Sequence, residues 1–384
     1  MKHHKYGGST AERTMNCPAW INLAEGIPKG KASTPALEGT AMHTLFEKGV
    51  VDEGYDPDVD IGTVQKDPEG NVTITQVHAD KVVDALEVLD KVIEKYDMDV
   101  DAEASMEYDA DTGGTADIIG FNPEDNVFAV GDLKTGDGLM VYAEENAQLL
   151  FYTWLAVMEY RHEFEFNSET VFLLFIIQPS ERRDDPLDVW QTDLATIVAF
   201  GEAFKLAVRV SNSGHKDPNP GKWCKYCPAL FTCPAKTGLV AAASRLRHDS
   251  GELDDLIKAM TMVDDVEEWC RAVRKMAHEQ AEQGVKLPGY KIVNKRATRI
   301  WTNPAETEKT LKLARKITIA DYMEMTLMSP AKLEKVLKRK KVDFKKYESM
   351  ITLHSSGTTL VKADDKRQEA LPLDRIAGMV ASIN

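Results

Sequence analysis

The chain has 384 residues, 43% of them hydrophobic, which is enough for a sizeable core in two domains or in one elaborated domain. No stretch approaches the roughly 18 uninterrupted apolar residues of a membrane span, and the polar N-terminus lacks the apolar segment of a signal peptide. These features exclude a membrane-spanning protein and predict a cytoplasmic one. The net charge of −15 counts against extensive phosphate contact, because such contact needs Lys and Arg.

Helices and a loop are predicted for the first quarter of the chain. A short helix should stop at Pro18, and Pro35 at a first helical position opens a helix over 34–51. Asp, Gly and Pro are frequent over 52–76, which predicts a loop with one hairpin. Apolar residues at helical spacing then predict a helix over 79–96.

Strands and helices alternate over the middle of the chain. Strands are predicted over 101–109, 114–121, 126–134, 171–177 and 187–192, and helices over 141–160, 194–210 and 252–283. The unbroken apolar run over 171–177 is typical of a strand at the centre of a sheet. This order predicts an α/β fold in which helices pack on a sheet.

A carboxylate and a lysine stand where one of these strands leaves the core. Side chains alternate along a strand, so Asp132 and Lys134 emerge on the same side. A surface ion pair is the alternative interpretation of this pattern. The preceding strand contains Asp117, and the loop over 122–126 has the length and composition of a hairpin connection. Antiparallel pairing across that loop would bring Asp117 close to Asp132.

Two adjacent carboxylates repel each other unless a cation lies between them. Oxygen ligands favour Mg²⁺ or Mn²⁺, which commonly bind through one or two carboxylates together with substrate phosphates. The lysine would then orient or deprotonate a water molecule, or stabilise negative charge in the transition state. Glu103 and Glu107, one strand earlier, are further candidates for the metal site, with a solvated strand face as the alternative.

Four short motifs carry a resemblance to a known family. They are Gly39-x-x-x-His43, Gly114-x-x-Asp117, the run from Gly131 through Asp132 and Lys134 to Gly136, and Gln148-x-x-x-Tyr152. Their types and order resemble the PD-(D/E)XK nuclease superfamily in its RecB-like branch. The resemblance implies a restriction-endonuclease-like core, a central mixed sheet flanked by helices. It also implies that His43, otherwise an ordinary half-buried histidine, joins Asp117 and Asp132 in binding the metal. Gln148 and Tyr152, four residues apart on one helical face, would hold the scissile strand or brace the site.

The cysteines form a second pattern. Cys224, Cys227 and Cys233 lie close together in a turn-rich segment, and Cys17 lies far upstream. An odd total of five cysteines and the CxxC spacing favour metal binding over disulfides, with either Zn²⁺ or an iron–sulfur cluster suited to thiolates. The arrangement resembles the 4Fe-4S clasp of AddB-type and CRISPR-associated RecB-like nucleases, in which the cluster joins the two ends of the nuclease domain. Cys270 is predicted to be a buried free cysteine.

The end of the chain is basic. Residues 285–346 hold 17 Lys plus Arg and 6 Asp plus Glu, a local charge of +11. Residues 287–293 predict a turn followed by a strand. We expect nucleic-acid contacts from this region, a solvated helical face being the alternative; the candidates are Lys295, Arg296, Arg299, Lys338, Arg339 and Lys340. The expected domains are a clasped nuclease domain over 1–240 and a helical, basic α+β region over 250–384.

The sequence thus predicts a metal-dependent deoxyribonuclease that acts on DNA. The resemblance extends to a phage and prophage family and implies hydrolysis that leaves 5′-phosphates. An exonuclease in phage recombination or replication is the favoured assignment, acting in the host cytoplasm beside a single-strand annealing or single-strand-binding protein. The alternative is a catalytically silent iron–sulfur subunit that binds DNA or serves as a scaffold.

Overall fold

The computed structural model describes residues 4–27, 32–52, 54–180, 185–245, 253–291 and 293, and farther along 310–313, 330, 333–334, 337 and 342–350. Its contacts divide the chain into two units, residues 1–298 and residues 299–384. The second unit includes a 3₁₀-helix, η5 (Phe344–Met350), among its described residues. All other elements named below belong to the first unit. The predicted domain boundary between 240 and 250 stays a prediction.

Several helices and one hairpin precede the main sheet. They are η1 (Gly8–Thr10), α1 (Ala11–Asn16), α2 (Trp20–Leu23), α3 (Thr34–Val51), η2 (Pro57–Asp60), β1 (Val64–Asp67), β2 (Gly70–Thr73) and α4 (Gln76–Tyr96). The helix over 34–51 and the hairpin in the following loop agree with the prediction. Helix α4 starts earlier than predicted because the Thr75 side chain accepts a hydrogen bond from the backbone N–H of His78 and caps the helix.

The main sheet has five strands in the order β3-β4-β5-β6-β7. Their bounds are β3 (Asp99–Glu107), β4 (Gly113–Asn122), β5 (Val127–Leu133), β6 (Val171–Ile177) and β7 (Leu187–Thr192). Strands β5 and β6 pair in parallel and the other neighbours pair antiparallel, so the sheet is mixed, as predicted. The hairpin between β4 and β5 turns where Asn122 Oδ1 accepts from the backbone N–H groups of Glu124 and Asp125.

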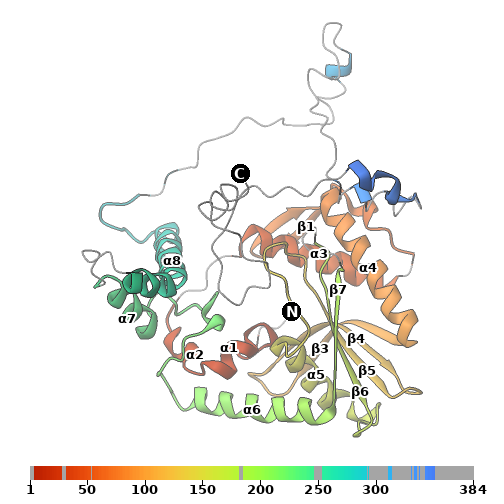
Figure 1. Cartoon of the computed structure of the whole chain (residues 1–384), viewed down its shortest axis with the longest axis horizontal. Coiled ribbons are helices and arrows are strands. Elements are labelled where there is room, and N and C mark those ends of the chain that lie inside the picture. The colour runs from red at the N-terminus through yellow and green to blue at the C-terminus, as the bar shows by residue number, and fades with distance from the viewer. Residues whose placement is uncertain are drawn as a thin grey trace, which may run out of the picture. The chain divides into compact units, whose positions relative to one another are not determined.

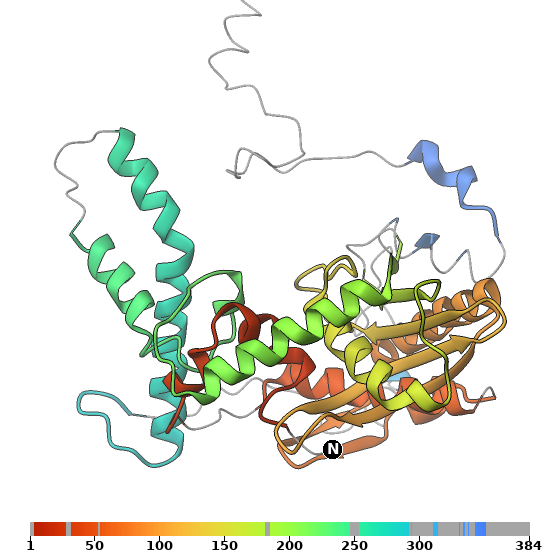
Figure 2. The ribbon, with the colours of Figure 1, turned by 90° about the horizontal axis from the view of Figure 1, so that it is seen from below.

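Helices cover both faces of the sheet (Figure 1, Figure 2). On one face α5 (Ala147–Glu159) and α6 (Leu194–Asn212) pack with α1 in a core that includes Phe128 and Phe172. On the other face α3 and α4 pack in a core that includes Ile118 and Phe175. The first unit is therefore mixed α/β, with helices on both faces of its five-stranded sheet.

Two predicted elements differ from the structure. Helix α5 starts at Ala147 and not at 141, because the Asn146 side chain accepts from the backbone N–H groups of Gln148 and Leu149 and caps the helix there. The turn predicted at the start of 287–293 is present, with the N–H of Tyr290 donating to the carbonyl of Leu287 at 3.0 Å, but the described residues 290, 291 and 293 do not lie in a strand. A 3₁₀-turn, η3 (Tyr160–His162), follows α5.

The first unit ends in η4 (Lys222–Cys224) and two helices, α7 (Pro234–Ala243) and α8 (Leu253–Glu282). Helix α8 agrees with the predicted long helix and packs against α7. Lys236 of α7 is buried and forms an ion pair with Asp265 of α8. In the part of the chain that the structure describes, no helix combines the length and apolar character needed to cross a membrane.

Candidate active site and cysteine cavity

Asp132 and Lys134 form an ion pair at the end of β5, and Gln148 hydrogen-bonds to both. Asp132 is 2% exposed, and its Oδ2 lies 2.6 Å from Lys134 Nζ. Gln148, on the first turn of α5, donates from Nε2 to Asp132 Oδ1 at 2.8 Å and accepts from Lys134 Nζ at 3.0 Å. The surface ion pair considered from the sequence is wrong for Asp132, because this carboxylate is buried.

Burial dominates the electrostatics of Asp132. It raises the pKa of this carboxyl, and the negative charge of Asp117 acts in the same direction, while the ammonium of Lys134 opposes both. Oδ2 is buried and, although it faces the ammonium, makes no hydrogen bond of good geometry to a described residue. One oxygen of Asp132 thus keeps acceptor capacity inside the site.

The pairing of β4 with β5 brings Asp117 beside Asp132. Ile118 of β4 is opposite Gly131 of β5, so one further step of the antiparallel register puts Asp117 opposite Asp132. Its Oδ2 accepts from the backbone N–H of Leu133 at 2.7 Å. Its Oδ1 lies 3.2 Å from Nδ1 of His43, which α3 brings to the sheet.

His43 carries a pKa above its ordinary value. Burial lowers its pKa, but the hydrogen bond to Asp117 and the charges of Asp117 and Asp132 outweigh that effect. The histidine therefore holds a proton more readily than a solvated imidazole. A bound cation would have to displace that proton, because a metal ligand must be the neutral imidazole.

Glu103 completes a group that could hold a metal ion. One ligand atom from each of His43, Glu103 and Asp117 lies within 4.8 Å of the others. Glu103 is half-buried, so a solvated strand face does not describe it, whereas Glu107 is exposed. Asp132, predicted as a ligand with His43 and Asp117, is outside this group of three and contacts Lys134 and Gln148 instead.

Tyr152 lies one helical turn beyond Gln148 and is almost fully buried. Burial and the charges of Asp132 and Asp117 raise the pKa of its hydroxyl. Its ring fills the space over two glycines: a Cβ on Gly8 would lie 2.5 Å from Tyr152 Cζ, and a Cβ on Gly114 would lie 2.9 Å from Cε1. This contact explains physically why a glycine precedes Asp117 by three residues.

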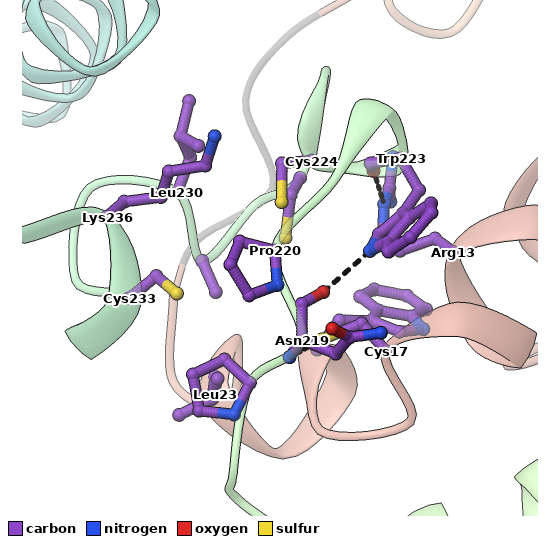
Figure 3. Close-up of a pocket in the computed structure, with 14 residues that line it drawn as sticks. Arg13, Cys17, Leu23, Asn219, Pro220, Trp223, Cys224, Leu230, Cys233 and Lys236 are labelled. Atoms are coloured by element: carbon purple, nitrogen blue, oxygen red, sulfur yellow. Dashed lines mark hydrogen bonds between the residues drawn. The ribbon is translucent and has the colours of Figure 1, made fainter. Parts of the chain in front are cut away.

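The predicted cluster cysteines, Cys17, Cys224, Cys227 and Cys233, all line one cavity (Figure 3). Cys17 follows α1, Cys224 ends η4, Cys227 lies in the next loop, and Cys233 precedes α7. All four are free thiols, three of them buried and Cys227 half-buried. The fold thus brings Cys17 to a segment that is some 200 residues later in the chain.

Polar groups around these sulfurs would stabilise thiolates, whereas burial opposes their deprotonation. The backbone N–H of Asn219 donates to Cys17 Sγ and that of Gly221 donates to Cys224 Sγ, each at 3.4 Å. Burial raises the pKa of Cys227 to about 11, so without a metal this thiol stays protonated at neutral pH. The charged side chains of Arg13 and Lys236 also line the cavity, where they would offset thiolate charge.

The remaining candidates are placed as follows. Cys270, on α8, is half-buried where the sequence predicts a buried cysteine. The predicted nucleic-acid-binding residues all lie outside the described residues; they are Lys295, Arg296, Arg299, Lys338, Arg339 and Lys340.

The fold and the site define a mixed α/β protein with a histidine–carboxylate group able to hold a metal ion beside a buried aspartate–lysine pair. The chain belongs to the family described as "Protein of unknown function (DUF2800)", whose model matches residues 3–368.

Two solved structures are also similar to this chain. The crystal structure of the "Putative exonuclease" from Eubacterium rectale matches with 14% identity and a TM-score of 0.34, over 58% of this chain and 87% of that one. The crystal structure of SSO0001 matches with 18% identity and a TM-score of 0.23, over 42% of this chain and 75% of that one. Neither likeness is close enough to define the fold or the activity of this protein.

Proposed function

We propose that this protein is a metal-dependent DNA nuclease. The observation that carries the proposal is the buried Asp132, which is paired with Lys134 and held by Gln148, directly beside the Asp117–His43 pair. A buried carboxylate with a raised pKa next to a second carboxylate is typical of a functional site, because neither stability nor solubility favours it. The same residues carry the resemblance to RecB-like nucleases.

The donor set fits a divalent cation. His43 and Asp117 offer an imidazole nitrogen and a carboxylate oxygen at 3.2 Å from each other, and Asp132 is a further buried carboxylate, whose Oδ2 is paired with Lys134. Carboxylate oxygens suit Mg²⁺ and Mn²⁺, and an imidazole is well tolerated by Mn²⁺. A bound cation of this kind would polarise a phosphoryl oxygen and lower the pKa of a bound water.

The protein's own side chains would position the reacting groups. Gln148 hydrogen-bonds to both Asp132 and Lys134, so it fixes the direction of the ammonium. The side chain of Lys134 is 28% exposed while that of Asp132 is 3% exposed, so the lysine is the member of the pair that solvent and substrate can reach. Lys134 would orient the attacking water or stabilise charge on the phosphate. Tyr152, wedged over two glycines, would brace α5 against β4.

The finer assignments rest on the family resemblance. It supports an exonuclease that leaves 5′-phosphates and that works in phage recombination or replication with a single-strand annealing or single-strand-binding partner. DNA is the proposed substrate. The predicted basic residues near the C-terminus are the proposed DNA contacts outside the active site.

The decisive experiment is a cleavage assay with the purified full chain. Linear duplexes labelled at either end and covalently closed circles would be incubated with Mg²⁺, Mn²⁺ or EDTA. We expect metal-dependent loss of linear DNA that disappears in Asp132→Ala. Resistance of closed circles would identify an exonuclease, because a circle has no ends.

Binding of DNA without cleavage under every metal condition would contradict the proposal. It would favour a catalytically silent subunit that binds DNA or serves as a scaffold. Glu107→Ala is a suitable control variant, since Glu107 is an exposed carboxylate on the sheet outside the metal-binding group. It should cleave like the unchanged protein.

We also propose that Cys17, Cys224, Cys227 and Cys233 hold a 4Fe-4S cluster. The fit is supported by four free thiols around one cavity, by backbone N–H groups directed at two of the sulfurs, and by two cationic side chains in the lining. Soft thiolates accept either iron–sulfur clusters or Zn²⁺, and the family resemblance favours the cluster. Its role would be structural, because it would join the segment after α1 to the segment before α7.

Anaerobic purification followed by metal analysis tests this second proposal. We expect a brown protein with about four iron and four sulfide per chain. A colourless protein with one zinc per chain would instead identify a zinc site.

A further inference from the structure

A groove outside the sites described above lies between α3, η2, α4 and the start of β3. Its volume is about 800 Å³. The lining residues that the structure describes belong neither to the histidine–carboxylate group, nor to the Asp132–Lys134 pair, nor to the cysteine cavity. The groove therefore has no part in the chemistry proposed so far.

The floor of the groove is apolar. Helix α4 buries one face against the sheet, and a second face of the same helix, over 83–94, lines the groove. The apolar positions of this second face extend from 83 to 93, which is about 15 Å of helix. Apolar surface of this extent, bordered by charged groups, is typical of a protein interaction site. The half-buried apolar side chains in the groove are Val50, Tyr55, Val83, Leu86, Ile93 and Val100.

Contacts within the protein already fix the shape of the groove. Leu86 lies directly on the backbone of α3, because a Cβ on Gly49 would be 2.4 Å from Leu86 Cδ1. The hydroxyl of Tyr55 donates to Asp60 Oδ2 at 2.5 Å, and Lys48 Nζ forms an ion pair with the same oxygen at 2.8 Å. A partner would not have to order these side chains, which lowers the entropic cost of binding.

The charged groups around the groove all have the same sign. Among the lining residues that the structure describes there is no Lys, Arg or His, although α4 itself contains three lysines at 81, 91 and 95. Only acidic members of α4 reach the groove. The carboxylates of the lining are those of Asp56, Glu87, Asp90, Glu94 and Asp99.

We propose that this groove docks a basic amphipathic helix of a partner protein. Apolar side chains at helical spacing on that helix would cover the floor, and flanking Lys and Arg would face the carboxylates. Nucleic acid does not fit, because its phosphates would be repelled. Outside residues 285–346, with their local charge of +11, this chain of net charge −15 is strongly acidic, so that part of a second copy does not fit either. Residues 285–346 hold the proposed DNA contacts, which leaves the groove to another protein.

The groove lies close to the candidate active site without sharing its residues. Gly49 and Val50 follow His43 on α3 by six and seven residues, a separation of about 10 Å along the helix. A helix docked there would hold its protein beside the His43–Asp117 pair and leave that pair accessible.

Fluorescence anisotropy of a labelled synthetic peptide with the full chain tests the docking site. The peptide is a helix of roughly 14 residues, about four turns, with leucine along one stripe and Lys and Arg on both sides of it. A second peptide carries Glu in place of Lys and Arg, and a third carries Ser in place of leucine. We expect only the first peptide to bind.

Charge reversal in the groove should weaken this binding. Glu87→Lys combined with Glu94→Lys changes two exposed side chains of the lining and should raise the Kd by at least about tenfold. Glu159→Lys combined with Glu163→Lys makes the same change in charge at exposed positions outside the groove and should leave the Kd unchanged. Ile93→Ser, which removes part of the floor, should also raise the Kd. Equal melting temperatures would exclude unfolding as the cause.

Three results would overturn the proposal. They are absence of binding by the unchanged protein, equal binding of the peptide without leucine, and an equal loss of affinity in both double variants. Carbodiimide cross-links in the free protein between Glu87 or Glu94 and lysines over 332–341 would also overturn it, since the chain's own basic segment would then fill the groove. Peptide binding by a protein that does not cleave DNA would support the docking site and contradict the nuclease proposal, so the two fail separately.

Discussion

The ammonium of Lys134 lies 2.6 Å from the carboxylate of Asp132, and the two side chains are not equally buried. Asp132 is enclosed, while the lysine reaches the surface of the site and is held by Gln148. Because the buried member depends on the exposed one for its charge balance, the lysine should affect both stability and chemistry.

Replacing Lys134 by Met should therefore reduce cleavage and stability together. Loss of a positioned proton donor or charge is expected to slow single-turnover cleavage by a factor of about 10²–10⁴. The unpaired Asp132 should cost about 1–3 kcal/mol of unfolding free energy at neutral pH, measured by urea denaturation without metal.

Lys48→Met is the control for this variant, because Lys48 forms an ion pair with Asp60 but is 43% exposed. It should change stability by at most about 1 kcal/mol and leave cleavage unchanged. Equal cleavage rates in Lys134→Met and the unchanged protein would contradict the assigned role of Lys134.

Metal binding should strengthen as pH rises from about 5 to 8. Two ligands hold protons more tightly than usual in the metal-free protein: the pKa of His43 is raised, and that of Glu103 is raised to about 7. Mn²⁺ must displace these protons, so its affinity should rise by up to about tenfold per pH unit for each proton released. Calorimetry at pH 6 in buffers of different ionisation enthalpy would count the protons. A pH-independent Kd with no proton release would contradict the ligand set.

The same two groups make metal-free stability depend on pH in the opposite direction. Both folded-state pKa values lie above the ordinary values of 6.5 and 4.5, so the folded state binds more protons than the unfolded state. Their contribution to stability is fully present below pH 4.5 and is lost as pH rises through about 7 and through the raised pKa of His43. The increase in melting temperature on adding Mn²⁺ should therefore be larger at pH 8 than at pH 6.

Gly131→Ala should destabilise the sheet directly below the site. A Cβ on Gly131 would lie 2.4 Å from two ring carbons of Phe175, on the neighbouring parallel strand. Overpacking of this kind typically costs about 1–3 kcal/mol, which thermal melting would detect. A Cβ on Gly136 meets nothing within 4 Å, so Gly136→Ala is the matched control and should change stability by less than about 0.5 kcal/mol. A melting temperature equal to that of the control would contradict the packing shown here.

Cys17→Ser should release the cluster and loosen the first unit. A cross-link that closes a loop of this length contributes on the order of 5 kcal/mol in the chain-entropy model, so a marked fall in melting temperature should accompany loss of iron. Cys270→Ser tests a half-buried cysteine outside the cavity and should keep full iron content. Full iron in Cys17→Ser would show that Cys17 is not a cluster ligand.

Local patterns determined most of the secondary structure. The strands over 171–177 and 187–192 and the helix over 34–51 match the structure because an apolar run, an alternating edge and a proline at the first helical turn are signals within the segment itself. The sequence pattern predicts a start for helix α5 that is six residues too early. The backbone N–H of Ala143 donates to Asp188 and that of Val141 to Gln178, and these distant partners hold 141–146 out of the helix.

The sequence by itself also determined the residue types of the site and their order, because the spacing of the motifs can be read from the chain without knowing the fold. Only the tertiary structure decided how they share contacts: Asp132 turns to Lys134 and Gln148, while Asp117 turns to His43. It also decided that Glu103 is in the site. Glu103 has a left-handed backbone conformation, which changes the face of the sheet that the following side chains occupy, and the hydrophobic pattern of the sequence does not reveal such a change. The tertiary structure also decided that Cys17 and Cys224 line the same cavity. Folding of the chain over some 200 residues brings them together, and local sequence propensity cannot predict this.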